Sequence, residues 1–403
     1  MTSNEGRLPL EGIKILDAST MLAAPWSCTF LADYGAEVIK VEHPDFGDHA
    51  RNYGSKKDGI PLLWKTLNRN KKTITLNLKE EEGQRLFKEL AAQVDVVVEN
   101  FKPGTFEKWN LGWDVLSEVN PSLIMLRTTG YGQTGPYSTR GGFGTVAEAM
   151  SGFTSVNGAA DGPPILPGIA LADGVSGVFG ALSIMIALHE RINNPEHKGQ
   201  VIDISLYEPL MRFLEPHLMA YNQLGKVAER LGNGSNTTAP RNAYQTKDGS
   251  WVALSASTQT ITTNVFKAIG RAELIEDDKF STNVNRLKHV NEIDEILGNW
   301  IKERDLDEVV DILSESGAVV GPMYDVSQLF EDPHYQHRET FIKLEDEELG
   351  EIEVPNVVAK FSRTPGKVRS SGATKGKYNE EIYKEMLGLS DERLEELKKL
   401  NII

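Results

Sequence analysis

The chain has 403 residues, of which 40% are hydrophobic, and it carries a formal net charge of −15. This length and hydrophobic content suffice for a large core and predict two domains. The acidic balance argues against nucleic acid as the main partner. The single cysteine, Cys28, excludes an internal disulfide framework and fits a reducing compartment. Residues 1–7 form no apolar signal region, so we expect a cytoplasmic protein with no membrane partner.

Strand and helix patterns alternate through the N-terminal part of the chain. Parallel strands joined by helical crossovers form a sheet that is covered on both faces. The fold class is therefore predicted to be α/β. Its short apolar strands are expected at 13–17, 37–42, 73–78, 95–99 and 123–128, and helices lie between them at 21–34, 79–94 and 113–119.

Several common sites are not encoded here. The first strand is followed by Ala18-Ser-Thr-Met-Leu-Ala-Ala-Pro25 and not by G-x-G-x-x-G, which disfavours a dinucleotide. There is no Walker loop, and His334 and His337 lie three apart without a nearby carboxylate pattern, so we expect no metal. The stretch Gly174-Val-Ser-Gly177 is not a G-x-S-x-G elbow, which disfavours a serine hydrolase.

A local excess of positive charge follows the second strand. Seven basic side chains stand against one acid between residues 51 and 72, which predicts a positive patch for a polyanionic small molecule, although a solvated surface loop is the alternative. Further lysines follow the third and fourth strands, where open α/β sheets bind ligands. The basic residues are Arg51, Lys56, Lys57, Lys65, Arg69, Lys71 and Lys72, followed by Lys79, Lys102 and Lys108.

Asp173 is the only ionisable side chain between Asp161 and His189. Burying an unpaired carboxylate is costly, so its place in an apolar run suggests a functional role. The alternative is that Asp173 caps the helix that follows. The run from Gly174 to Leu188 is too short and too rich in glycine to span a bilayer, and we expect a buried helix there.

A second α/β pattern begins near residue 225. A loop rich in glycine and small polar residues spans 231–240, a turn at 247–249 leads into a strand, and amphipathic helices are expected at 260–269, 292–300 and 305–316. A charged C-terminal helix can dock back on the first domain. The predicted organisation is a large domain over 1–205, a linker over 206–224, a small domain over 225–325, and a return linker with C-terminal segment over 326–403.

The chain resembles the family III CoA-transferases, which include formyl-CoA transferase, carnitine CoA-transferase and α-methylacyl-CoA racemase. The likeness runs nearly end to end. It implies a Rossmann-like large domain, a smaller α/β domain and an interlocked homodimer. The segments that carry it are LPLEGIKILD (8–17), LADYGAEVIKVE (31–42), VENFKPG (98–104), GYGQTGP (130–136), GQVIDISL (199–206), the block around Asp173, and GNGS (232–235).

The resemblance implies nucleophilic catalysis by Asp173, which matches the family's catalytic aspartate. The carboxylate would attack an acyl-CoA thioester to give a mixed anhydride, then an aspartyl-CoA thioester, and a carboxylic acid acceptor would reverse these steps. A nearly apolar pocket would exclude the water that hydrolyses the anhydride. Backbone N–H groups at a helix N-terminus are expected to keep the nucleophile ionised.

The family's contacts transfer to this sequence position by position. Leu22 replaces a common glutamine and has no side-chain hydrogen bond to offer the thioester, while His43 and Lys108 replace arginines. Arg140 is a candidate contact for a dicarboxylate such as oxalate or succinate. The implied coenzyme A contacts are Leu22, Ala23, His43, Leu76, Lys79, Asn100, Phe101, Lys102, Lys108 and Phe143, and the implied active-site loop is Gly232, Asn233 and Gly234, with Tyr53 packed against it.

Three alternatives to transfer stay open. A racemase needs an acid–base pair, but Gly142-Phe143-Gly144 stands where the family's racemases have Gly-His-Asp, which disfavours that activity. An acyl-CoA binding module with a dead site is disfavoured by Asp173. A thioesterase would need a base near Asp173 that activates water. The two acids that exchange CoA are not specified by the sequence.

Overall fold

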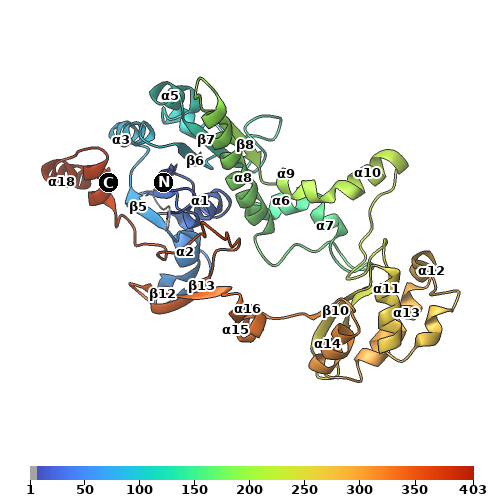
Figure 1. Cartoon of the computed structure of the whole chain (residues 1–403). Helices are drawn as coiled ribbons and strands as arrows, with labels where there is room; N and C mark the ends of the chain where they lie inside the picture. Colours follow the sequence, from blue (N-terminus) through green and yellow to red (C-terminus); the bar gives the residue numbers. More distant parts are fainter. Residues whose placement is uncertain (1–6) are drawn as a thin grey trace. The chain divides into compact units, whose positions relative to one another are not determined.

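The computed structural model describes residues 7–403, so residues 1–6, on which the absence of an apolar signal was partly judged, lie outside it. The chain divides into two units (Figure 1). The first unit runs to Phe153 and adds Leu166–Asn222 and His337–Ile403, and the second contains Thr154–Ile165 and Gln223–Gln336. The second unit therefore takes in 154–165 and 326–336, which the predicted boundaries place elsewhere.

A six-stranded sheet forms the centre of the first unit, and all of its strand pairs are parallel. The expected α/β fold with a parallel sheet is confirmed. Five strands lie where the sequence predicts them, but the edge strand β8 was missed because it is only half buried and lacks a continuous apolar run. The order is β5 (Lys71–Thr75), β2 (Glu37–Glu42), β1 (Lys14–Asp17), β6 (Val96–Glu99), β7 (Ile124–Thr129) and β8 (Val201–Ser205).

Alternate residues of each strand face opposite sides of this sheet, and each side has its own core. Ile15 of β1 packs on the face covered by α1 (Ala23–Asp33) and α8 (Leu171–Asn193), where Cys28 is also buried. Leu16 packs on the other face. The helices there are α3 (Glu81–Ala91), α4 (Thr105–Lys108), α5 (Trp113–Val119), α17 (Asn379–Glu385) and α18 (Asp391–Lys399).

Two glycines let α8 lie directly against α1. A Cβ at Gly177 would come within 2.8 Å of Trp26 Cβ, and one at Gly180 would overlap with Ser27 Oγ. Among the described residues, α8 is the one helix long and apolar enough to cross a membrane, a test that core helices of soluble proteins also pass. The expected buried helix is buried on one side only, because Ile186 on its other side is 60% exposed.

A buried ion network lies at the carboxyl end of β1. Asp17 pairs with Lys71 Nζ at 3.0 Å and with Lys40 Nζ at 3.7 Å, and Lys40 also pairs with Asp48 at 2.9 Å. Asp48 Oδ1 accepts the backbone N–H groups of Met21 and Ala50, and Asp17 Oδ1 accepts that of Ser19. The network therefore fixes the course of the loop that follows β1.

The basic segment between residues 51 and 72 is mostly neutralised by ion pairs. Lys56 and Lys57 remain exposed on the hairpin of β3 (Lys56–Lys57) and β4 (Ile60–Pro61). The prediction of a positive patch across this segment is wrong, because five of its seven cations are used to hold the fold together. The pairs are Arg51 with Glu42, Lys65 with Asp346, Arg69 with Asp33, Lys71 with Asp17, and Lys72 with Glu37.

Shorter elements complete the first unit. The C-terminal segment shares the core of the sheet, since Tyr383 and Leu397 are fully buried there. Gly388, at φ 67°, separates α17 from α18, so the predicted single C-terminal helix is two. The remaining elements are η1 (His49–Asn52), α2 (Leu62–Leu67), α6 (Gly144–Met150), α9 (Glu208–Met211), η2 (Arg212–Leu214), and the hairpin of β12 (Phe341–Asp346) and β13 (Gly350–Pro355).

The second unit has its own core around an antiparallel sheet of order β11-β10-β9. Val252 of β10 packs with Phe266, Leu297 and Leu313 from three helices. Its elements are β9 (Arg241–Gln245), β10 (Trp251–Ser255), α11 (Gln259–Ala268), η3 (Ala272–Ile275), α12 (Asn283–Lys288), α13 (Val290–Ile301), α14 (Leu306–Glu315), β11 (Val320–Pro322) and α15 (Val326–Glu331). Helices α7 (Phe153–Val156), α10 (Glu215–Leu224) and α16 (Pro333–His337) cross from one unit to the other.

Candidate active site

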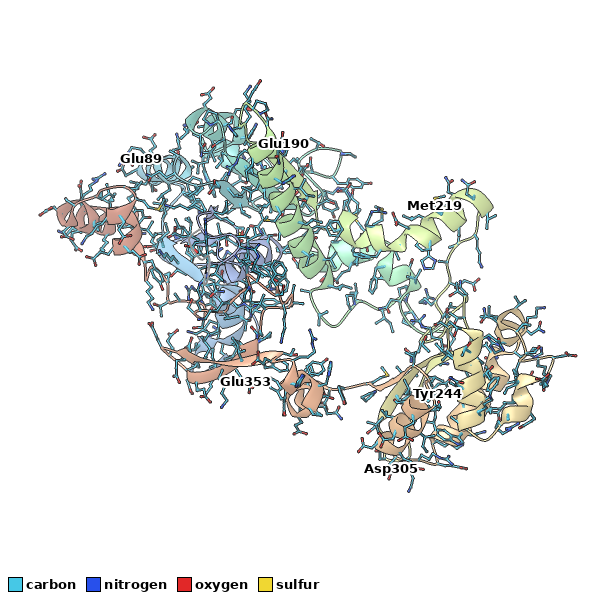
Figure 2. The ribbon with its side chains drawn as sticks, viewed as in Figure 1. Glu89, Glu190, Met219, Tyr244, Asp305 and Glu353 are labelled. Carbon is cyan, nitrogen blue, oxygen red and sulfur yellow. The ribbon has the colours of Figure 1, made fainter. Side chains whose placement is uncertain are left out.

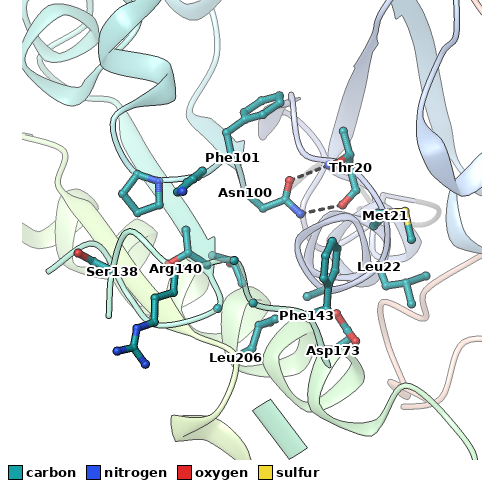
Figure 3. A pocket seen from close by; sticks show the side chains of 18 of the residues that line it. Thr20, Met21, Leu22, Asn100, Phe101, Ser138, Arg140, Phe143, Asp173 and Leu206 are labelled. Carbon is teal, nitrogen blue, oxygen red and sulfur yellow. Dashed lines mark hydrogen bonds between the residues drawn. The ribbon is translucent and has the colours of Figure 1, made fainter. Parts of the chain in front are cut away.

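The strand order of the main sheet defines where a ligand crevice is expected. The chain builds outward from β1 through β2 and β5 on one side and from β6 through β7 and β8 on the other. Ligands of open α/β sheets bind beyond the carboxyl ends of the strands at such a reversal. The loops after β1 and β6 are joined there, because Thr20 N donates to Asn100 Oδ1 at 2.8 Å and Asn100 Nδ2 donates to Thr20 O at 2.7 Å (Figure 3).

A first cavity of about 590 Å³ opens at this reversal. It is bordered by the loops after β1, β6 and β7 and by the start of α8. The structure thus brings together eight residues that the sequence placed at the site. These are Leu22, Ala23, Asn100, Phe101, Lys102, Arg140, Phe143 and Asp173.

A smaller cavity of about 260 Å³ shares Thr20, His49 and Phe101 with the first, and we call it the aromatic cavity. The predicted residues His43, Leu76 and Lys79 line it. The rings of His43 and Phe46 stack with centroids 4.0 Å apart, and the ring of His49 also stacks with Phe46, with centroids 5.5 Å apart. Burial lowers the pKa of His43, and Lys79 adds to the effect, so we expect this ring to be uncharged at neutral pH.

His43 and Lys108, the two residues that replace family arginines, therefore differ in their positions: His43 borders the aromatic cavity and Lys108 does not. Lys108 lies exposed on α4 and borders none of the cavities described here. Lys79 and Lys102 are exposed and border the aromatic and first cavities, respectively. These two lysines, with Arg140 from the loop after β7, supply positive charge at the carboxyl ends of the strands.

A second cavity of about 480 Å³ shares Met21, Leu22, Phe143 and Asp173 with the first. Its other walls are the segment 166–170 before α8, the first turn of α6 and the predicted loop contact Tyr53. Phe143, which is 70% exposed, lies beside Asp173 and Leu22 (Figure 3). Asp173 therefore borders both cavities.

Asp173 does not cap α8. The N-cap is Ala170, which has no side-chain hydrogen bond, and Asp173 is the third residue of the helix. The backbone N–H groups of Leu171 and Ala172 donate to Glu148 Oε1 at 3.0 and 3.3 Å. A second carboxylate therefore occupies these two N–H groups, and of the expected backbone stabilisation of ionised Asp173 there is a hydrogen bond from the N–H of Asp173 itself, which acts to lower its pKa.

The surroundings of Asp173 disfavour its charged form. Burial and the negative charge of Glu148 raise the pKa of Asp173 to about 6. Gly144, the first residue of α6, packs directly on the carboxylate, and a Cβ there would overlap with Asp173 Oδ2. Gly174, on the other side, leaves a Cβ 4.0 Å from Trp26 and so does not crowd the site.

Glu148 and Met21 are site residues that sequence reasoning missed. Glu148 is the only ionisable side chain between Arg140 and Asp161, which is the same signal that drew attention to Asp173. Met21 adopts φ 65°, an uncommon conformation for a residue with a side chain. Its backbone N–H donates to Asp48 Oδ1 at 3.1 Å, so the buried ion network holds it there. No sequence pattern signals that conformation.

Arg140 borders the first cavity but not the second. Its guanidinium lies over the Tyr137 ring, 3.8 Å from the centroid, and the side chain points away from Asp173 (Figure 3).

The predicted loop of Gly232, Asn233 and Gly234 belongs to the second unit, where Gly232 N donates to Gly158 O. Its closure over Asp173 stays a prediction. Within residues 7–403, no group of three or more His, Cys, Asp or Glu side chains could hold a metal ion.

Comparisons with known proteins agree on one family. The family model described as CoA-transferase family III matches residues 10–377. The chain is 42% identical to the succinyl-CoA–L-malate CoA-transferase beta subunit of Chloroflexus aurantiacus over 98% of each chain. It is 40% identical to the succinyl-CoA–D-citramalate CoA-transferase of the same organism over the full length of both.

A solved structure agrees with this likeness. The crystal structure of a CAIB/BAIF family protein from Brucella suis covers 94% of this chain and 100% of its own, with a TM-score of 0.84 and 31% identity. Asp173 and the cavities beside it lie within the residues that the family model matches. The chain belongs to the family III CoA-transferases, and it is an enzyme that transfers CoA.

Proposed function

We propose that this CoA-transferase moves CoA from succinyl-CoA to a dicarboxylic or hydroxydicarboxylic acid, with Asp173 as the nucleophile. The observation that carries the proposal is the position of Asp173, which borders both cavities and has no cationic partner among the described residues. A carboxylate that is partly buried and has no cationic partner is poorly stabilised as an ion, and its place in the lining of both cavities makes it accessible to a substrate.

The cavities suggest how the CoA thioester binds. The first cavity would receive the pantetheine arm and bring the thioester carbon to Asp173. The aromatic cavity suits the adenine, because the stacked rings of His43, Phe46 and His49 offer flat apolar faces. Lys79 and Lys102 would meet the phosphates. The acyl group and the acceptor acid would then lie in the second cavity.

The proposed reaction proceeds through acyl-enzyme intermediates, and every bond that forms replaces one that breaks. An Asp173 oxygen attacks the thioester carbonyl, and the C–S bond breaks to give a mixed anhydride and CoA thiolate. The thiolate attacks the aspartyl carbonyl carbon and releases the donor acid as its carboxylate. The acceptor carboxylate attacks the aspartyl-CoA thioester, and the returning thiolate attacks the acceptor carbonyl, which frees Asp173. The cycle consumes and releases no proton.

The nature of the acids follows from the relatives and from the second cavity. Two similar proteins carry names that specify succinyl-CoA with L-malate or D-citramalate. The described lining of the second cavity contains no lysine or arginine, but it includes the hydroxyl-bearing Tyr53 and Thr145. Hydroxyl groups are therefore the hydrogen-bonding partners that this cavity offers to a hydroxy acid. The choice of an acceptor of the malate class therefore rests on the named relatives, and these hydroxyl groups are compatible with it.

We also propose that the chain forms a homodimer, which the apolar surface of α8 and the residues after it supports. Val178, Leu182 and Ile186 follow one another at helical spacing on α8 and are each more than half exposed. Phe213 is 66% exposed and Met219 is 60% exposed, and Met219 lies on α10 (Figure 2). Exposed apolar side chains in this number are typical of a protein contact. Sedimentation or light scattering would test the dimer, and the cytoplasmic location stays a prediction.

The test of the proposed function is a panel of acceptor acids supplied with succinyl-CoA. L-malate and citramalate should receive CoA, and monocarboxylic acids of similar size should do so more slowly. Intact-mass analysis after rapid quenching should find CoA attached to the protein. Mass spectrometry after digestion should place the CoA on the peptide that contains Asp173. Release of free CoA without any acid would indicate a thioesterase, and exchange of the α-proton in heavy water would indicate a racemase. Binding of acyl-CoA without either reaction or adduct would indicate a dead site.

A further inference from the structure

The carboxylate of Glu148 is built into the start of α8. Glu148 is only 3% exposed, and its Oε1 accepts hydrogen bonds from both Leu171 N and Ala172 N, the first two N–H groups of the helix. Without Glu148, these two N–H groups would have no partner within the helix. Glu148 also lies on α6, one turn after Gly144, whose backbone contacts Asp173 Oδ2. Helix α6 thus supplies both Gly144, which contacts the Asp173 carboxylate, and Glu148, which places a second carboxylate near it.

No cation balances the two carboxylates within the part of the chain that the structure describes. The loops that border the cavities bring His49, Tyr53, Lys102 and Arg140, but Glu148 alone exerts a charge effect on Asp173. Helix α1 meets this end of α8 through Trp26. On α9, which also packs on α8, Glu208 Oε2 accepts a hydrogen bond from Ser205 Oγ at 2.6 Å.

We propose that Glu148 is a positioning residue that fixes the first turn of α8 and places a negative charge beside Asp173, which makes ionised Asp173 a less stable and more reactive nucleophile. This inference rests on the proposed role of Asp173. When Asp173 becomes an anhydride or thioester, its charge leaves the site and the repulsion from Glu148 ends. The ionised enzyme is therefore raised in free energy relative to the acylated intermediates. The same repulsion raises the pKa of Asp173, in addition to the effect of burial.

The decisive variant is Glu148→Gln, which keeps the length of the side chain and an oxygen that can accept the two N–H groups. Without the charge, the acidic limb of the kcat/KM profile should move down by about one pH unit, a typical effect of one nearby like charge. At pH 8, where Asp173 is ionised in both proteins, kcat should fall about tenfold for an interaction of that size. A purely structural cap would change neither the limb nor kcat in this variant.

Two further variants make the test specific. Asp325→Asn removes the charge from another helix N-cap, where Asp325 accepts Ser327 N and Gln328 N, and it should leave the limb in place. Glu148→Asp keeps the charge but draws the carboxylate back from the helix, so its limb should stay near that of the native enzyme while kcat falls. The proposal would be overturned if the acidic limb of the kcat/KM profile lay at the same pH in the native enzyme, Glu148→Gln and Glu148→Asp. If the Gln variant does not fold, native kcat in the Asp variant would overturn it.

The outcome can be separated from the fate of the proposed function. Transfer and the Asp173 adduct are first measured on the native protein, where Glu148 is unchanged. Failure at that stage refutes the nucleophilic role of Asp173. If the native enzyme forms the adduct and Glu148→Gln has the same acidic limb of the kcat/KM profile and the same kcat, only the role of Glu148 is refuted.

Discussion

Two aspartates of the first unit lie in contrasting surroundings. Asp17, at the end of β1, is fully buried and pairs with Lys71 and Lys40, and these cations lower its pKa although burial acts to raise it. Asp173, at the start of α8, is partly buried, has no cationic partner among the described residues and has Glu148 beside it. Its pKa is raised to about 6 by burial and by that charge.

The difference separates a structural carboxylate from a reactive one. Removing a charge from water is tolerated when opposite charges and hydrogen bonds replace the solvent, as they do around Asp17. Asp17 and Asp48 thereby fix the loop that brings Met21 and Leu22 to the cavities. Asp173 has a backbone hydrogen bond from its own N–H but no opposite charge among the described residues, so its carboxylate is compensated far less than that of Asp17. The ion network maintains the shape of the site, and the unpaired carboxylate reacts.

The largest expected effect is on turnover in Asp173→Asn. The amide has a similar shape but is a very poor nucleophile, so transfer should fall by at least about 10³-fold. CoA should still bind, because the cavities keep their walls. Transfer is measured by chromatography of the CoA products, and binding is measured by calorimetry.

The control for this variant is Asp161→Asn. Asp161 is the exposed acid that precedes Asp173 in sequence, and its loss should leave turnover unchanged. Near-native turnover in Asp173→Asn would contradict the assignment of the nucleophile. Loss of CoA binding together with turnover would indicate instead that Asp173 shapes the binding site.

The next largest effect is on stability in Asp17→Asn. This change leaves Lys40 and Lys71 buried beside a neutral side chain, and breaking a buried ion pair from one side costs about 3–5 kcal/mol. The free energy of unfolding should fall by that amount in urea titrations followed by circular dichroism. Asp203→Asn, on the exposed edge of the same sheet, serves as the matched control. A loss below about 1 kcal/mol, the size typical of a surface pair, would mean that the network adds little to stability.

Part of the fold and of the candidate site could be predicted from the sequence, and part could not. The strands that cross the centre of the sheet have continuous apolar runs, so β1, β2, β6 and β7 were predictable. Edge strand β8 has no such run. The family motifs identified Asp173 and most residues that border the first cavity. They could not show that Glu148 takes the N–H groups of α8, because this contact joins residues that are 23 and 24 positions apart.

The basic segment between residues 51 and 72 was predicted to be a binding patch, and this prediction was wrong. Charge counting along the chain places seven cations together, but it does not reveal which carboxylates face them in the fold. Lys71 meets Asp17 from a neighbouring part of the sheet, and Lys65 meets Asp346 from far along the chain. Pairing across long sequence distances is therefore what turned a predicted binding patch into a structural network.

A third expected effect compares the two glycines that flank the nucleophile. In Gly144→Ala the new methyl group would overlap with Asp173 Oδ2, so the carboxylate or α6 must move. Misplacement of a reacting group by about 1 Å can cost 10²-fold, and we expect kcat/KM to fall by about 10- to 100-fold. Gly174→Ala meets only Trp26 at 4.0 Å and should retain activity. Steady-state kinetics of both variants measure the effect, and equal activities would show that close packing of α6 is not required.

The smallest expected effect is the pH dependence of stability. A carboxyl whose pKa is raised from 3.8 to about 6 on folding stabilises the protein below pH 3.8, and this contribution is lost as the pH rises through 6. Asp17, whose pKa is lowered, acts in the opposite direction: its contribution is present above pH 3.8 and is lost as the pH falls through its lowered value. Asp173→Asn should therefore become more stable than the native protein as the pH rises.

The size of that gain follows from the shift in the pKa of Asp173. Each pH unit between the two pKa values is worth about 1.4 kcal/mol, and partial exposure of Asp173 reduces the total, so we expect about 1–2 kcal/mol at pH 7 and almost none at pH 4. Urea titrations at several pH values measure the difference between the two proteins. A gain that is constant with pH would mean that Asp173 titrates normally, and its contrast with Asp17 would then rest on geometry alone.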